Sequence, residues 1–392
     1  MLHFVKSFLP NHMQRQMREL FVSTTLVNLA LAMVIIFEPI YLYQSGYSLN
    51  KIMFFYFVVY ALYLLIVPIG AKFSRRFGYE QGILVGTIMY IVFYLALFAI
   101  GFWPWMFFVA PILYAIQKMF YWPAYHADFA RFSDNREEGR SVSSITAITS
   151  LVYILGPVLA GFLVSQWGYG ALFTVASIIF LTSNIATLVT KEKFNPGDFN
   201  YKDAYKSLFS KENRQSFLAY AGYGEELVVM VIWPVFISIV IVNLFDLGLV
   251  VTLATLVTTV ALLYIGKLTD SRNKRKILSL GAVFYSLAWF FRIFVSTTAG
   301  VFFVDTMSRL GKNVVSVPLV ALTYEQAKLV ENQQKKTSVM NRVIFFEMSL
   351  IVGKILAIIA IYILTLFVAD EVLAFKITFI LAGGMSLFYM LL

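Results

Sequence analysis

Long apolar segments recur along the whole chain, and each is about the length that a membrane-spanning helix needs. A helix requires about 20 apolar residues to cross the hydrocarbon core of a bilayer. Of the 392 residues, 60% are hydrophobic and only 13% are charged, whereas soluble domains carry about 25% charged residues. We therefore predict an all-α polytopic membrane protein. Twelve segments qualify as transmembrane helices, near residues 20–44, 50–70, 80–100, 104–130, 141–165, 169–190, 216–243, 247–268, 276–296, 299–326, 339–368 and 371–392.

The connections between these segments alternate in charge. One set is short and almost uncharged, as in GFWPW and STTAG, while the other set is basic. Together with the N-terminal segment, the basic connections hold 24 of the 31 lysines and arginines. Because basic connections stay in the cytoplasm, both termini are predicted to be cytoplasmic, in the inner or plasma membrane of the cell. Most of the basic residues behind the net charge of +10 then lie at the inner membrane surface, so no nucleic-acid partner is expected.

The sequence also repeats itself at an offset of about 196 residues. ARFSDNREEGRSVSS at 130–144 aligns with AKLVENQQKKTSVMN at 327–341, and several prolines and glycines recur at nearly the same offset. Parallel repeats of six spans build two halves around a site near the middle of the membrane in one transporter architecture. We predict two pseudo-symmetric six-helix bundles, residues 1–190 and 216–392, joined by a cytoplasmic linker at 191–215.

The segment GKLTDSRNKRK at 266–276 resembles the loop signature of the major facilitator superfamily. Gly266, Asp270 and the basic cluster that begins at Arg272 match that signature. The corresponding segment of the first half, GAKFSRRFGYE, has the glycines and arginines but no Asp. The resemblance implies secondary active transport by alternating access, with Gly266, Asp270 and Arg272 as gating residues.

A second segment, LGPVLAG at 155–161, resembles the antiporter motif of the same superfamily, and so gives a partial resemblance to drug/proton antiporters. The resemblance implies a gating role for Gly156 and Pro157. A helix kink with close packing accounts for the same two residues equally well.

Several charged residues lie inside the apolar segments, where each costs about 2.5 to 3.5 kcal/mol on insertion scales. Lys118 and Lys312 occupy equivalent places in the repeat, near the middle of the membrane. Asp305, Arg309 and Lys312 share one helix face, so Asp305 is expected to pair with Arg309. Arg292 is instead expected to extend to the outer surface of the membrane.

In the superfamily that the chain resembles, spans 1, 4, 7 and 10 line a central cavity. The charged residues of these spans are predicted to face this solute-sized space, with structural ion pairs between helices as the alternative interpretation. The predicted solute contacts are Lys118, Tyr121, Tyr125, Arg309, Lys312 and Asn313. Desolvation and mutual repulsion disfavour ionisation of the adjacent carboxylates Glu225 and Glu226. These residues are therefore predicted to carry a coupling proton, with Glu226 facing the cavity. Glu38 and Asp305 are the further candidates for proton coupling.

The predicted function is proton-coupled secondary active transport of a small organic solute. LGPVLAG and the aromatic residues of span 4, such as Tyr114 and Trp122, favour export of amphipathic compounds, which is the leading prediction. The cations near the midplane favour uptake of an anionic or zwitterionic metabolite, and lipid flipping is a third alternative. The chain has no cysteine and three histidines, so no metal site, cofactor or catalytic cluster is expected. We expect a monomer that is not an enzyme, with the solute, protons and the lipid bilayer as partners.

Overall fold

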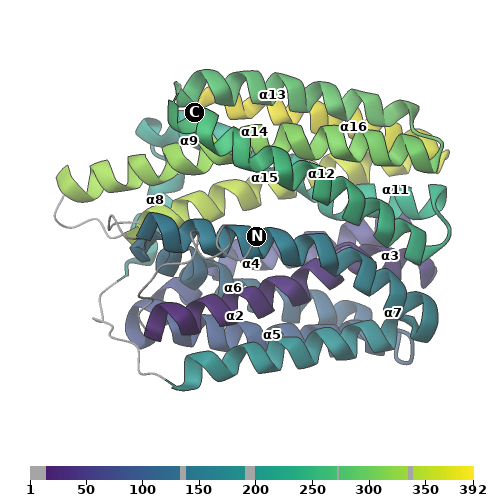
Figure 1. Cartoon of the computed structure of the whole chain (residues 1–392), viewed down its shortest axis with the longest axis horizontal. Coiled ribbons are helices and arrows are strands. Elements are labelled where there is room, and N and C mark those ends of the chain that lie inside the picture. The colour runs from purple at the N-terminus through teal and green to yellow at the C-terminus, as the bar shows by residue number, and fades with distance from the viewer. Residues whose placement is uncertain (1–14, 133–137, 190–198, 272, 334–338) are drawn as a thin grey trace, which may run out of the picture.

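Helices make up all the regular structure that is described, and no strand occurs in this part of the chain. The computed structural model describes the backbone of residues 15–132, 138–189, 199–271, 273–333 and 339–392. The side chains of 15–21, 129–148, 186–189, 262–271, 320–321 and 323–339 are outside the description. Figure 1 shows the long helices lying side by side along the longest axis of the molecule.

One set of helices precedes the predicted linker, and the other set lies within and after it. Those before it are α2 (Arg15–Val34), α3 (Phe37–Gln44), α4 (Leu49–Phe77), α5 (Tyr79–Ala99), α6 (Met106–Phe132) and α7 (Glu138–Val189). Those within and after it are α8 (Tyr201–Leu208), η1 (Lys211–Asn213), α9 (Arg214–Ala221), α10 (Gly224–Leu227), the π-helix η2 (Val228–Ile232), α11 (Trp233–Val240), α12 (Leu244–Ser271), α13 (Lys274–Phe291), η3 (Arg292–Phe294), α14 (Thr298–Gln333), α15 (Val339–Phe367), α16 (Glu371–Ser386) and η4 (Leu387–Leu391).

The predicted apolar segments coincide with these helices, and the all-helical membrane fold is confirmed. Among the described residues, nine helical stretches are long and apolar enough to cross a membrane. One stretch within α7 covers two predicted spans, while α6 and α14 are not among the nine. The total of twelve spans stays a prediction.

α7 changes direction at Gly168. This residue has φ +79° and ψ 178°, a conformation outside the helical range that glycine adopts without a steric penalty. The chain turns back in this region at the edge of the bundle (Figure 1). The two spans predicted on either side of SQWGYG therefore lie within one labelled helix.

The break expected at GKLTDSRNKRK begins later than predicted. α12 continues past Gly266 to Ser271, and α13 begins at Lys274. The side chain of Asn273 accepts hydrogen bonds from the second and third backbone N–H groups of α13, at 3.0 and 3.3 Å, and so caps this helix. The first residues of the predicted loop are therefore helical, and the capping residue that starts the next helix lies seven residues beyond Gly266.

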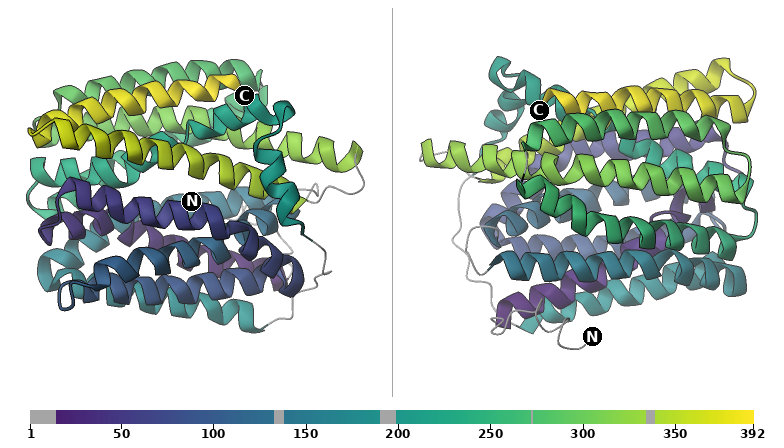
Figure 2. Two further views of the ribbon diagram at one scale, coloured as in Figure 1. Left: turned by 180° about the vertical axis from the view of Figure 1, so that it is seen from behind. Right: turned by 45° about the horizontal axis from the view of Figure 1, so that its top comes forward.

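The helices before and after the linker pack as two groups. The first group consists of α2, α4, α5, α6 and α7, and the second of α12, α13, α14, α15 and α16 with the shorter helices near them. Between the groups, α7 packs along α12, and α4 packs along α15. Figure 2 shows the same arrangement from behind and with the second group turned forward.

α7 and α12 approach each other closely where LGPVLAG lies. A Cβ added to Gly248 of α12 would lie 2.3 Å from the carbonyl oxygen of Pro157. One added to Gly156 would lie 2.5 Å from the Cβ of Ala32 on α2. Small residues allow helix backbones to come together in this way inside membranes. The motif therefore packs between α2 and α12, as the close-packing interpretation predicts.

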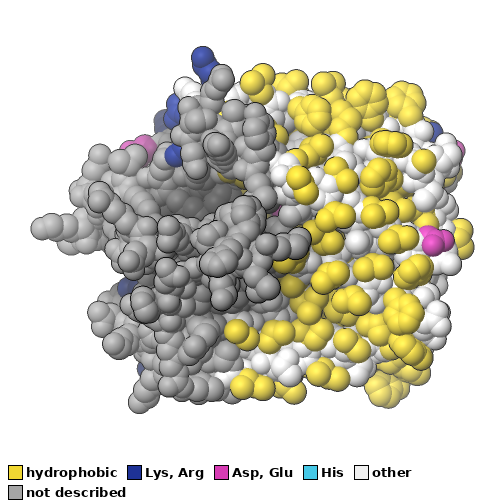
Figure 3. Space-filling model, in the orientation of Figure 1, with side chains coloured by type: hydrophobic (Ala, Val, Ile, Leu, Met, Phe, Trp, Pro, Cys, Tyr) yellow, Lys and Arg dark blue, Asp and Glu magenta, His cyan; other side chains and the backbone are white. Residues whose placement is uncertain are grey.

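Hydrophobic side chains cover most of the described part of the face drawn in Figure 3. Large exposed apolar residues occur on many helices, among them Leu159, Val260 and Leu280. Soluble monomers rarely expose contiguous apolar surface of this extent. The surface is the one that a helix bundle presents to lipid.

Candidate functional site

A cavity of about 290 Å³ lies between the two groups of helices. We call it the central cavity. Ligand-binding cavities have volumes from about 300 Å³ upward, so the space suits a small organic molecule. Its described lining residues are Leu31, Ile35, Tyr60, Tyr63, Tyr90, Tyr94, Tyr114, Lys118, Trp122, His126, Tyr153, Tyr223, Glu226, Met230, Arg342, Val343, Phe346, Glu347, Leu350 and Lys354.

Seven tyrosines dominate this lining, and the sequence-based prediction misses six of them. Only Tyr114 belongs to the aromatic residues noted on span 4. Tyr60 and Tyr63 on α4 are three residues apart, and Tyr90 and Tyr94 on α5 are four apart, so each pair shares a helix face. This spacing is the signal that points to a tyrosine-lined wall.

Lys118 is a buried cation of the central cavity whose described contacts are with tyrosine rings. The residue is 7% exposed, and its Nζ lies 4.1 Å from the ring centre of Tyr114 and 5.6 Å from that of Tyr60. No described carboxylate lies within 4 Å of this Nζ. Cation–π contacts contribute about 0.5–2 kcal/mol, less than the desolvation cost of several kcal/mol for a buried ion. An anionic ligand would supply the missing compensation.

Glu226 and Lys354 form an ion pair in the same lining. Oε2 of Glu226 lies 2.7 Å from Nζ of Lys354, and this Nζ lies 5.3 Å from the ring centre of Tyr60, which also faces Lys118. Glu226 lies in α10, two residues before the π-helix η2 begins. π-helical turns are frequent at functional sites. Glu226 is among the residues that line the central cavity, and its role in proton coupling stays a prediction.

Glu347 connects the two walls of the central cavity. Its Oε2 accepts a hydrogen bond from the Tyr63 hydroxyl at 2.9 Å, and its Oε1 lies 3.1 Å from Nε2 of His126. Tyr63 and His126 come from α4 and α6 of the first group, whereas Glu347 comes from α15. This buried carboxylate therefore links helices on both sides of the cavity.

Lys312, the repeat counterpart of Lys118, is paired with a carboxylate. Its Nζ contacts Oε1 of Glu225, and the hydroxyls of Tyr285 and Tyr389 donate to the same carboxylate at 2.6 and 2.8 Å. Glu225 is fully buried. Neither Lys312 nor Asn313 is among the described lining residues of the central cavity. The geometry of Lys312 fits the structural ion pair that the sequence left as an alternative.

The lining of the central cavity also lacks other predicted residues, among them Glu38, Tyr121 and Tyr125. Glu38 is buried and accepts hydrogen bonds from the hydroxyls of Tyr56 at 2.7 Å and Tyr94 at 3.4 Å. Tyr121 and Tyr125 stack on each other with ring centres 5.7 Å apart. Because Tyr94 also lines the cavity, Glu38 is separated from that space by one side chain.

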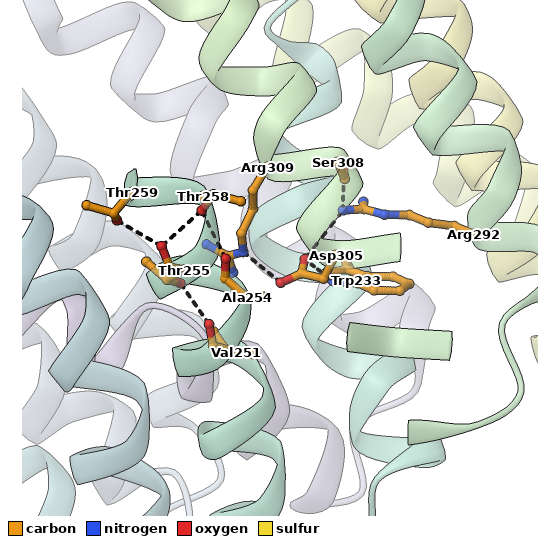
Figure 4. A network of polar contacts seen from close by, with 10 residues as sticks. All are labelled: Trp233, Val251, Ala254, Thr255, Thr258, Thr259, Arg292, Asp305, Ser308 and Arg309. Carbon is orange, nitrogen blue, oxygen red and sulfur yellow. Dashed lines mark hydrogen bonds and ion pairs between the residues drawn. The ribbon is translucent and has the colours of Figure 1, made fainter. Parts of the chain in front are cut away.

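Asp305 lies between two arginines, as Figure 4 shows. Nε of Arg309 donates to Oδ2 at 2.6 Å, which confirms the predicted pair, and Nη2 of Arg292 lies 3.8 Å from Oδ1. Nε1 of Trp233 donates to Oδ1 at 2.9 Å. Arg292 is 1% exposed and its guanidinium lies 3.8 Å from the ring centre of Trp289. The prediction that Arg292 extends to the membrane surface is wrong, because these tryptophans and Asp305 hold it inside the bundle.

The predicted gating residues fall into two sets. Gly156 and Pro157 lie in the close contacts of α7 with α2 and α12. Gly266 and Asp270 lie near the end of α12, where only the backbone is described, and Arg272 lies outside the described residues. The gating role of these residues stays a prediction.

Apolar helices packed around a buried cavity with charged and tyrosine side chains define a class, the polytopic membrane proteins that hold a solute between two groups of helices. Residues 20–245, more than half of the chain, match the Major Facilitator Superfamily. The chain belongs to this superfamily, as predicted, and it is a secondary transporter of small solutes. A comparison with curated proteins finds no match.

Proposed function

We propose that the protein transports a small organic anion with an aromatic part, together with a proton. The observation that carries this proposal is Lys118, a buried ammonium in the central cavity with tyrosine rings as neighbours and no described carboxylate within 4 Å. An anion beside Lys118 would form charge-assisted hydrogen bonds. The tyrosine rings would contact the apolar part of the solute in edge-to-face or offset geometry.

Glu226 is the proposed proton carrier. Lys354 neutralises it, with Nζ 2.7 Å from Oε2 of Glu226. Tyr60 neighbours both Lys118 and Lys354, so an anion bound at this tyrosine competes with Glu226 for Lys354. A carboxylate that loses its cation in a poorly solvated cavity takes up a proton. Solute and proton therefore move in the same direction.

The charge preference is tested with three probes that share one ring. Benzenesulfonate is expected to bind the purified protein about tenfold more tightly than benzyl alcohol or benzylamine, because only the sulfonate compensates Lys118. Isothermal titration calorimetry in detergent measures the three affinities. Equal affinities, or tighter binding of the amine, would contradict the assignment of an anionic solute.

Proton coupling is tested with Glu226→Gln in proteoliposomes. An inward proton gradient is expected to drive benzenesulfonate accumulation by the wild-type protein, and the sulfonate stays ionised, so it does not cross the bilayer as a neutral acid. The variant should lose this accumulation but retain exchange of labelled for unlabelled benzenesulfonate, because Gln mimics the protonated carboxylate.

Glu212→Gln is the matched control, since Glu212 is an exposed acid outside the cavity. It is expected to accumulate the anion at the wild-type rate. Gradient-driven accumulation by Glu226→Gln at that same rate would move the coupling site to Glu38 or Asp305.

The organisation predicted from the sequence belongs to this proposal. It comprises two six-helix bundles, residues 1–190 and 216–392, and a monomer in the inner or plasma membrane with cytoplasmic termini. The basic connections on one side support this orientation. Export of amphipathic compounds is the second candidate, favoured by LGPVLAG, although close packing gives Gly156 and Pro157 a role that does not require export.

A further inference from the structure

A second, smaller cavity of about 190 Å³ lies beside the central one. The two share Ile35, Tyr153 and Met230 as lining residues. An engineered protein cavity of roughly 150 Å³ binds benzene, so the smaller cavity has room for a molecule of about that size.

Aliphatic side chains form much of the described wall of the smaller cavity, among them Ile36, Val229, Ile237 and Val251. The central cavity, in contrast, presents seven tyrosines. Burial of methylene groups away from water is favourable. The wall of the smaller cavity therefore favours a short aliphatic chain.

Arg309 is the one charged residue among the described residues that line the smaller cavity. Its Nε donates to Asp305 at 2.6 Å, and this is its one hydrogen bond within the described part of the chain. A third of its side chain, 33%, is accessible. The two terminal nitrogens of this guanidinium are therefore available to a ligand in the cavity.

The network around Asp305 carries one surplus positive charge. Arg292 and Arg309 both lie within 4 Å of this single carboxylate, and no other described carboxylate lies within 4 Å of either arginine (Figure 4). A net charge inside the membrane is costly unless a partner compensates it. A monoanion in the smaller cavity would neutralise the network through Arg309.

We propose that the smaller cavity is a second anion-binding site, which holds the carboxylate of a short aliphatic acid. The terminal nitrogens of Arg309 bind the two carboxylate oxygens as a fork, and the chain of the acid lies along the aliphatic wall. The site uses neither Lys118 nor Glu226. A test of this site is therefore independent of the function proposed for the central cavity.

Hexanoate is the probe for this site, measured by isothermal titration calorimetry on the purified full-length chain. Arg309→Gln is expected to lower the hexanoate affinity about tenfold or more, because the variant loses the charge-assisted hydrogen bonds to the carboxylate. Val229→Phe, which fills the cavity from a half-buried position, is expected to lower it as well. Lys118→Gln should lower the hexanoate affinity less than Arg309→Gln does, because Lys118 lines the central cavity and not the smaller one.

The folded state of each variant is checked by thermal unfolding. Arg309→Gln leaves Asp305 with Trp233 and Arg292 as partners, so its carboxylate stays compensated. Hexanol, which has the same chain without the charge, should bind wild type and Arg309→Gln equally. The proposal is overturned if wild type does not bind hexanoate, if Arg309→Gln and Val229→Phe bind it as tightly as wild type, or if Lys118→Gln weakens it as much as Arg309→Gln does.

Discussion

Replacing Lys118 with Gln is expected to abolish benzenesulfonate transport and to lower the affinity for this anion about tenfold to 100-fold. A hydrogen bond to a charged group contributes about 1.5–3 kcal/mol, and Lys118 is the central-cavity lysine without a described ionic partner. Thermal stability should be retained or raised, because the variant no longer buries an ammonium. Titration calorimetry, proteoliposome uptake and thermal unfolding measure the three quantities.

Lys51→Gln is the matched control. Lys51 also lies over a tyrosine, with Nζ 5.8 Å from the ring centre of Tyr47, but it is exposed and does not line the central cavity. This variant should bind and transport benzenesulfonate as the wild type does. A folded Lys118→Gln protein with wild-type affinity and uptake would remove Lys118 from the solute site, and with it the reason for assigning an anionic solute.

The membrane fold could be predicted from the sequence because the length of an apolar segment is fixed by the thickness of the bilayer. The same criterion gives no exact boundary. α12 continues through Gly266, although the residues after it are polar and look like a loop. A helix satisfies its own backbone hydrogen bonds, so α12 can extend into the polar residues beyond its apolar segment. The next helix, α13, then begins directly after its capping residue, Asn273.

Some residues of the candidate site could be predicted from the sequence, but the contacts between them could not. The sequence shows that Lys118 and Lys312 lie within apolar segments at equivalent positions of the repeat, but it does not show which of them is paired. The partner of Lys312 is Glu225, 87 residues away, and no comparable carboxylate reaches Lys118 among the described residues. Such pairing depends on how the helices are packed, and a pattern within one segment does not contain that information.

Arg292 illustrates the same limit. Its place near the outer end of an apolar segment gives its depth, and from depth alone an extended side chain that reaches water is expected. In the structure, Trp233 and Trp289 lie against the guanidinium, and Asp305 compensates its charge. The position of Arg292 in its segment predicts the depth of its backbone in the membrane, whereas the neighbouring side chains determine where its guanidinium lies.

Replacing Lys312 with Gln is expected to destabilise the protein strongly. Removing one partner of a buried ion pair costs about 3–5 kcal/mol, because the other charge stays buried without compensation. Here the remaining charge is the fully buried carboxylate of Glu225, which keeps only the hydroxyls of Tyr285 and Tyr389 as donors. Unfolding in detergent, followed by intrinsic fluorescence, measures the loss in free energy of unfolding.

Two further variants separate the ion pair from a role in solute binding. Glu225→Gln should be less destabilising than Lys312→Gln, because the Lys312 side chain is 23% exposed and lies near three tyrosine rings. The double variant Glu225→Gln/Lys312→Gln should recover most of the stability, since neither charge is then buried alone, and it should still bind benzenesulfonate. If Lys312→Gln instead keeps wild-type stability and loses benzenesulfonate binding, Lys312 contacts the solute, as the sequence alone predicts. The pair with Glu225 would then open when the solute binds, and the solute site would extend from the central cavity into the second group of helices.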